Sequence, residues 1–274
     1  MLRFLRARTF PGIEEVDAGS YARAFGPIEA PGWFRVSAWS RKVNALRLEL
    51  CCQRPSRILE IVTRVRRMFD LDADPQIIAV ALADDVELGP LVRARPGTRL
   101  PGAWDGFEAA VGSVLANTED RSGNDVSTRV LSTFGDPVDL PAQFSTNRLF
   151  PTPEGLADAD LAGAGIDRHA AAMIGCIARS LRDGRVDFDS ARTLGDFVDH
   201  WSALPGIDRR IAHDIALRAL GHPDAFPIGG TPADARRDAP GSNDASPGRL
   251  EKAQRWRPWR AYAFIHLMNA SGTG

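Results

Sequence analysis

The stretch of sequence that decides the fold is LGDFVDHWSALPGIDRRIAHDIALRAL, residues 194–220. Apolar residues recur at helical spacing over residues 194–203 and again over 209–220, so each part predicts an amphipathic helix. The link between them, 204–208, is short and contains Pro and Gly. Two helices joined by such a link form a compact hairpin.

The hairpin is a candidate phosphate site. Backbone N–H groups in the link and at the start of the second helix would point outward, and a helix N-terminus carries partial positive charge. The candidate contacts are five consecutive residues, two of them cationic: Gly206, Ile207, Asp208, Arg209 and Arg210. These residues alone leave a second interpretation open, which is a turn with only a structural role.

The composition excludes several classes of protein. The chain has 274 residues, with 34 Lys and Arg against 35 Asp and Glu, so net charge alone does not indicate a nucleic-acid partner. No apolar run approaches the roughly 20 residues that span a bilayer. The cysteines, Cys51, Cys52 and Cys176, are odd in number and lack metal-ligand spacing. We therefore expect a cytoplasmic protein with no metal, no cofactor and no membrane contact.

The pattern of elements predicts an α+β fold. Residues 33–39 and 43–50 are expected to be paired strands, because Leu46, Leu48 and Leu50 alternate with charged residues, as in a half-buried strand. A helix is expected to begin at Pro55-Ser56. No convincing strand follows residue 75, and helices are expected over 75–83, 103–116, 125–134, 153–161, 167–183, 194–203, 209–220 and 258–269. We expect a small sheet-containing domain over 1–74 and a mostly helical domain over 75–274.

Seven short motifs occur in an order that resembles one protein family. They are Phe4–Arg8, Met68–Leu71 with Asp74-Pro75, Leu100–Gly102 with Phe107-Glu108, Phe150–Pro153, Leu204–Ile207, Asp224–Pro227 and Arg255–Ala263. Together they resemble the AlkA-type 3-methyladenine DNA glycosylases of the helix-hairpin-helix superfamily. The resemblance implies that residues 194–220 bind double-stranded DNA, and we expect a monomer. It also implies hydrolysis of the bond between an alkylated base and its sugar, after the nucleotide is flipped out of the duplex.

The resemblance also locates the catalytic carboxylate. The family's Asp follows the Phe226-Pro227 pair by a few residues, which places it at Gly230, or near Pro232 if an insertion is allowed. Neither residue supplies a carboxylate. The nearest acid, Asp234, follows a Thr-Pro pair typical of a helix start, so a capping role is the simpler interpretation. Asp234 and Asp214 are the candidates for a relocated carboxylate.

The aromatic residues of the family's base pocket are largely substituted. Arg210, Asp214, Thr231 and Met268 stand where the family carries Trp or Tyr, and only Phe4 remains aromatic. The candidate base pocket therefore consists of Phe4 and Met268. Aromatic faces would otherwise stack on the positively charged alkylated base.

Two DNA-facing segments also depart from the family. After Leu115 the chain reads ANTEDRSGND, which offers no apolar wedge to fill the gap left by a flipped base. In the hairpin, Asp208 replaces a Gly. Asp tolerates the left-handed backbone expected at that position, but its charge would repel a nearby phosphate.

Three functions follow from these residues. The first is an AlkA-like scaffold that is catalytically impaired or inactive and binds DNA weakly. The second is an active DNA-3-methyladenine glycosylase whose carboxylate has moved to Asp234 or Asp214. The third is a non-catalytic interaction module on the same fold, since a fold does not by itself determine function.

Overall fold

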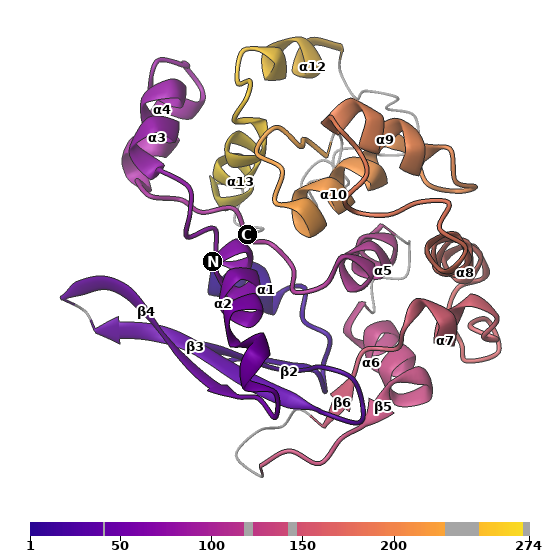
Figure 1. Cartoon of the computed structure of the whole chain (residues 1–274). Coiled ribbons are helices and arrows are strands. Elements are labelled where there is room, and N and C mark those ends of the chain that lie inside the picture. The colour runs from indigo at the N-terminus through magenta and orange to yellow at the C-terminus, as the bar shows by residue number, and fades with distance from the viewer. Residues whose placement is uncertain (41, 118–122, 142–146, 228–246, 271–274) are drawn as a thin grey trace. The chain divides into compact units, whose positions relative to one another are not determined.

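The computed structural model describes residues 1–40, 42–117, 123–141, 147–227 and 247–270, and Figure 1 shows their helices and strands. The chain forms two compact units. One unit contains residues 2–64 and 114–185, and the other contains Met1, 65–113 and 186–274. The expected domain boundary at residue 74 stays a prediction.

The first of these units is built on a four-stranded antiparallel sheet. Its elements are α1 (Leu2–Arg6), β1 (Glu14–Val16), β2 (Ser20–Phe25), β3 (Gly32–Ser40) and β4 (Val43–Cys51), and the strand order is β1-β2-β3-β4. The rings of Tyr21 and Phe25 lie 6.0 and 5.9 Å from that of Phe34. These buried rings form the core of the sheet's inner face.

The strand pair expected at 33–39 and 43–50 is confirmed as β3 and β4. The expected half-buried pattern is wrong for the outer part of β4, where Leu46 is 41% exposed. Leu46 is paired with Ala38, whereas the last β3 residue paired with β2 is Ser37. The β3–β4 hairpin extends beyond Ser20, where β2 begins. The apolar residues near the end of the hairpin therefore have less of the core to pack against.

The remainder of this unit is mostly helical. It contains η1 (Pro55–Arg57), most of α2 (Ile58–Met68), α6 (Gly123–Phe134), α7 (Pro153–Ala157) and α8 (Arg168–Arg182). Two short strands, β5 (Asp136–Pro137) and β6 (Arg148–Leu149), form an antiparallel pair. The expectation of no strand after residue 75 is therefore wrong at this one ribbon, whose two-residue strands are too short to show any periodicity.

The other unit is helical in its described part. It contains α3 (Pro75–Ala83), α4 (Leu88–Ala94), most of α5 (Gly106–Ala116), α9 (Leu194–Ser202), α10 (Arg209–Leu220), α12 (Pro247–Gln254) and α13 (Arg260–Ala270). The bounds expected for α3 and α10 are confirmed. The α+β class is confirmed as well, with the long strands confined to the N-terminal part of the chain.

Three of the quoted motifs meet in the helical unit around Asp70. Its carboxylate accepts the backbone N–H of Leu100 at 2.9 Å and the Tyr262 hydroxyl at 2.9 Å. The Arg99 guanidinium donates to the Asp70 and Ala73 carbonyl oxygens at 2.7 and 2.6 Å. Burial raises the pKa of Asp70. These motif residues therefore link three segments of the helical unit that lie far apart in the sequence.

Candidate nucleic-acid interface

The first helix of the hairpin, α9, begins at a reciprocal cap. The Thr193 hydroxyl accepts the N–H of Asp196 at 3.1 Å, and the Asp196 carboxylate accepts the N–H of Thr193 at 3.1 Å. This capping box satisfies two N–H groups that the helix leaves unpaired. Trp201 anchors the other end, with its ring 5.0 Å from that of Phe188 and 5.3 Å from that of Phe197. The position of the link that follows is thus fixed by buried aromatic packing.

The link itself turns at Gly206, whose φ is +84°. A side chain at that φ would be strained, which explains the Gly. The N–H of Ile207 donates to the Leu204 carbonyl at 3.0 Å and closes the turn. The Ile207 side chain is buried, so this residue can offer an outside ligand its backbone but not its side chain.

Asp208 caps α10. Its carboxylate accepts the N–H of Ile211 at 2.7 Å, and its backbone is extended, with φ −80° and ψ 170°. The left-handed backbone expected for Asp208 is therefore wrong, because an N-cap residue takes β-region angles and its side chain folds over the helix end. A carboxylate already occupies one of the donors that an anion would use at this N-terminus.

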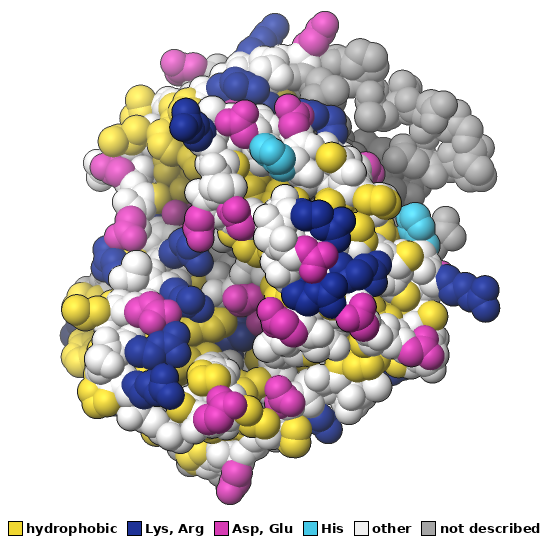
Figure 2. Space-filling model, turned by 45° about the vertical axis from the view of Figure 1, so that its right-hand side comes forward, with side chains coloured by type: hydrophobic (Ala, Val, Ile, Leu, Met, Phe, Trp, Pro, Cys, Tyr) yellow, Lys and Arg dark blue, Asp and Glu magenta, His cyan; other side chains and the backbone are white. Residues whose placement is uncertain are grey.

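Both hairpin arginines lie beside acids. Arg209 Nη1 lies 2.5 Å from Asp199 Oδ1, and Arg210 Nε lies 3.8 Å from Asp208 Oδ2. The two cations and two anions leave the hairpin surface with no net charge at these four positions. Figure 2 shows the same mixture more widely, with Lys and Arg side chains interspersed with Asp and Glu on the face it displays.

A buried ion pair fixes the chain after α10. The helix ends at Gly221, whose φ is +62°. The Asp224 carboxylate then accepts two bonds from the Arg260 guanidinium, at 2.6 and 2.8 Å, and lies 3.5 Å from Arg257. The N–H of Ala261 donates to the Pro223 carbonyl at 2.9 Å. This clamp fixes the backbone at Pro223 and Asp224, directly after the hairpin.

His213 completes the clamp from α10. Its Nδ1 accepts the N–H of Phe226 at 3.3 Å, so the neutral ring carries its proton on Nε2. Burial lowers the pKa of His213 to about 4, and the neighbouring Arg260 adds to the effect. The histidine is therefore neutral at physiological pH and acts as a hydrogen-bond acceptor for the loop.

The expected catalytic residues are only partly covered by the described chain. Gly230, Pro232, Thr231 and Asp234 lie outside the described residues, as do residues 118–122 of the wedge segment. Asp214 is described and is half-buried on α10. Its role as a relocated carboxylate stays a prediction.

The two candidate base-pocket residues are both buried. Met268 on α13 is 1% exposed, and on the same helix His266 is buried, with no hydrogen-bond partner for its Nδ1 among the residues that the structure describes. Burial lowers the pKa of His266. In the other unit, the ring of Phe4 is buried and the Arg8 guanidinium lies 3.9 Å from its centroid. The assignment of Met268 and Phe4 to a base pocket stays a prediction.

Two features of this region were not expected from the sequence. The cap at Asp208 could have been predicted, because an Asp immediately before a helical run is a preferred N-cap. The Asp224–Arg260 pair could not, because its residues lie far apart in the chain and only the fold brings them together. Among the described residues no group of His, Cys, Asp and Glu side chains could hold a metal ion, and no described helix is long and apolar enough to cross a membrane.

Solved structures show the class of fold. A 3-methyladenine DNA-glycosylase from Archaeoglobus fulgidus matches with a TM-score of 0.75 and 18% identity, covering 99% of this chain and 93% of that one. A Clostridium acetobutylicum 8-oxoguanine glycosylase/lyase in complex with double-stranded DNA matches with a TM-score of 0.70 and 14% identity, covering 99% and 92%. The chain therefore has a DNA glycosylase fold.

Sequence comparison shows the family. A model of the AlkA N-terminal domain matches residues 1–105. DNA-3-methyladenine glycosylase 2 of Escherichia coli is 30% identical over 278 residues, covering 99% of this chain and 93% of the relative. The chain belongs to the AlkA family. A probable bifunctional transcriptional activator/DNA repair enzyme AlkA of Mycobacterium tuberculosis is 31% identical over 271 residues, and the chain spans about half, 52%, of that protein's length.

Proposed function

We propose that the chain is an AlkA-family scaffold that binds duplex DNA weakly and excises alkylated bases slowly or not at all. The observation that carries this proposal is the Asp208 carboxylate over the N-terminus of α10. One relative is a probable DNA repair enzyme, another is a DNA-3-methyladenine glycosylase, and one structural neighbour was solved with double-stranded DNA, which makes DNA the expected partner. We expect the chain to act as a monomer in dilute solution, in the cytoplasm.

The weakness of binding follows from charge. A phosphate oxygen about 5 Å from the Asp208 carboxylate would be repelled by about 3 kcal/mol at an effective dielectric constant near 20, before salt screening. Arg209 and Arg210 are engaged by Asp199 and Asp208, so they attract a phosphate less than free cations would. The hairpin thus keeps its shape while losing most of its attraction for a polyanion.

The loss of catalysis follows from the residues at the family's site positions. Cleavage develops positive charge on the sugar, and Gly230 offers no negative charge to stabilise it. The loss of one preorganised electrostatic group typically costs about a hundredfold or more in rate. Replacing pocket aromatic residues by Arg210 and Asp214 removes roughly 1–3 kcal/mol of stacking for each ring. A base that is poorly held and poorly activated would be excised near the background rate.

Reversal of the cap tests the binding half of the proposal. Asp208→Gly should tighten binding to a duplex and steepen its salt dependence, because the variant lets more phosphate contacts form. Asp167→Gly is the matched control, since Asp167 caps α8 in the same way, accepting the N–H groups of His169 and Ala170. Fluorescence anisotropy with a labelled duplex measures both variants. If Asp208→Gly and Asp167→Gly bind alike, the hairpin is not the contact site.

An excision assay on methylated duplex DNA tests the catalytic half. We expect release of 3-methyladenine near background from the unmodified chain. Gly230→Asp combined with Arg210→Trp and Met268→Trp should recover more than the separate changes together, because the three substitutions act on one captured base. Robust release by the unmodified chain, abolished by Asp234→Asn or Asp214→Asn, would instead establish a relocated carboxylate.

A further inference from the structure

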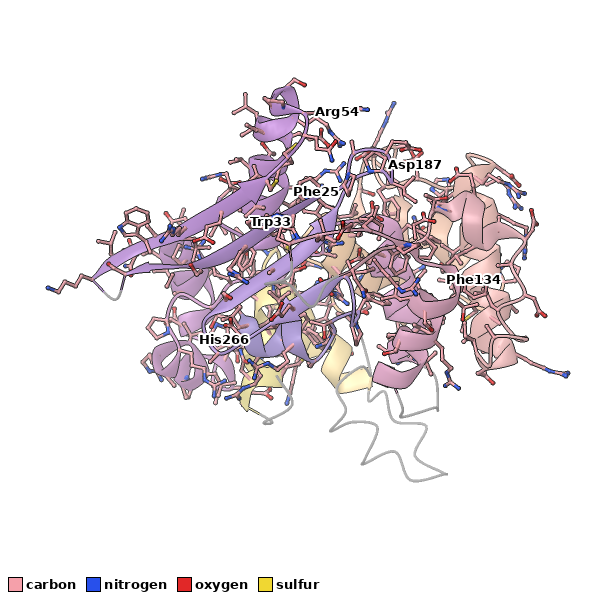
Figure 3. The ribbon with its side chains drawn as sticks, turned by 90° about the horizontal axis from the view of Figure 1, so that it is seen from below. Phe25, Trp33, Arg54, Phe134, Asp187 and His266 are labelled. Atoms are coloured by element: carbon pink, nitrogen blue, oxygen red, sulfur yellow. The ribbon has the colours of Figure 1, made fainter. Side chains whose placement is uncertain are left out.

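The outer strand of the four-stranded sheet has an unused edge. β4 spans nine residues, and in the part of the chain that the structure describes its only strand neighbour is β3. Figure 3 shows the β3–β4 hairpin extending past the other strands. The outward N–H and C=O groups of such an edge form a template for pairing with another strand.

Exposed apolar side chains gather on the same hairpin. Trp39 is 62% exposed and Val43 is 53% exposed, and Leu46 lies close by on β4. Ile58 and Leu59, at the start of α2, are also exposed. Covering these side chains with another chain would remove apolar surface from water.

We propose that β4 pairs antiparallel with β4 of a second copy of this chain, about a two-fold axis at Leu48. The occupant is a second copy because the strand is complementary to itself. Arg47 and Glu49 flank Leu48 and share the opposite face of the strand. Their side chains are 57% and 38% exposed and lie 3.2 Å apart within one chain, so each has an oppositely charged neighbour before any dimer forms. A two-fold axis at Leu48 places Arg47 opposite the partner's Glu49, and Glu49 opposite the partner's Arg47.

Other registers are worse. In an antiparallel pair, directly opposite residues share a face. A two-fold axis must therefore lie midway between the two copies of one residue, and that residue names the register. An axis at Arg47 sets two arginines opposite each other, and an axis at Glu49 sets two glutamates opposite each other, and like charges in opposite positions are destabilising. An axis at Leu46 sets Asn44 opposite the partner's Leu48. Only the axis at Leu48 joins opposite charges and matches leucines.

The Leu48 register also continues the existing sheet. On the charged face, Arg35 of β3 is already opposite Glu49, so cation, anion and cation would alternate from Arg35 through Glu49 to the partner's Arg47. On the leucine face, Leu46 would lie opposite the partner's Leu50. The hairpin tip at Val43 would then run towards the partner's Gln53 and the exposed start of its α2.

The expected dimer is weak and depends on concentration. Stable interfaces bury roughly 1,200–2,000 Å², and pairing along one strand with a few side chains falls at the lower end of association. The chain would be monomeric in dilute solution and dimeric when concentrated. This inference rests on the sheet unit alone and does not depend on the proposed DNA binding.

Charge reversal tests the pairing. Sedimentation equilibrium from micromolar to millimolar protein should show the mass of the unmodified chain rising towards twice the monomer. Arg47→Glu or Glu49→Arg alone should weaken association by about tenfold, and the two together should restore it. Arg64→Glu is the control, because it reverses a charge on α2 in the same unit but off the strand. A chain that stays monomeric, or a double variant that is not restored, overturns the proposal.

Crosslinking tests the register directly. An axis at Leu48 sets Ala45 opposite the partner's Cys51, and both residues are exposed. Ala45→Cys in a Cys52→Ser background should give a disulfide-linked dimer on oxidation with copper phenanthroline. Adding Cys51→Ser should prevent the link, because it removes the thiol that faces the introduced one. Failure to crosslink under conditions where the protein is dimeric would exclude this register.

Discussion

Asp224→Ala is the substitution that should damage the helical unit most clearly. The Asp224 carboxylate accepts two hydrogen bonds from Arg260, at 2.6 and 2.8 Å, and Arg257 lies 3.5 Å away. Arg260 itself is 5% exposed. Removing the carboxylate therefore leaves a buried guanidinium without its anion.

The size of the effect follows from the buried charge. Breaking a buried pair by removing one partner typically costs about 3–5 kcal/mol, because the remaining charge is still desolvated. For a chain of this size that corresponds to a fall in Tm of roughly 10 °C. Asp224→Asn should cost less, because the amide oxygen keeps one acceptor for the Arg260 guanidinium.

The matched control is Asp199→Ala. Its carboxylate also pairs with an arginine, Arg209, at 2.5 Å, but both side chains are mostly exposed. An exposed pair is worth at most about 1 kcal/mol. Urea denaturation, followed by tryptophan fluorescence and by circular dichroism, gives the free energy of unfolding of each variant. Equal losses for Asp224→Ala and Asp199→Ala would refute the argument that burial sets the cost.

Three further predictions concern the same unit. The pKa of His213 is about 4 in the folded chain and 6.5 in the unfolded chain. The unfolded state therefore binds the proton first, and stability is lost as pH falls from about 6.5 to about 4. His213→Gln should remove roughly 3 kcal/mol of that loss, as measured by denaturation at a series of pH values. Gly206→Ala should lower the free energy of unfolding by about 1–2 kcal/mol, because φ is +84° at that position; an unchanged thermal midpoint would contradict the strain. Tyr262→Phe should cost about 1–2 kcal/mol by leaving the Asp70 carboxylate without the hydroxyl that it accepts, as measured by urea denaturation; a stability equal to that of the unmodified chain would show that this bond contributes nothing net.

The sequence predicted the elements whose periodicity is long and left out most of the short ones. α10 was expected over the residues where it occurs, because its apolar positions recur over more than three turns. α1, α4 and β1 span too few residues for a period to emerge. The failure at Leu46 has another cause. The alternation of residues in a strand predicts which face they share, but not how far the strand extends beyond its core.

The candidate site was predictable to the extent that its residues are neighbours in sequence. The turn at Gly206 and the arginines that follow it could be located from the link alone. The pairing of Arg209 with Asp199 and of Asp224 with Arg260 could not, because each pair joins separate elements. Such charge pairs decide whether a cation is available to a ligand, so the electrostatics of the hairpin emerged only from the fold.

The cap at Asp208 explains how the hairpin can keep its shape without a ligand. The first N–H groups of a helix need acceptors, and in α10 the Asp208 carboxylate supplies one at Ile211. Replacing such a cap by Gly costs only a few tenths of a kcal/mol, whereas the same carboxylate would repel a phosphate by about 3 kcal/mol. The carboxylate therefore adds little to folding and subtracts much from anion binding. That imbalance is why Asp208→Gly should leave the fold intact while changing its affinity for DNA.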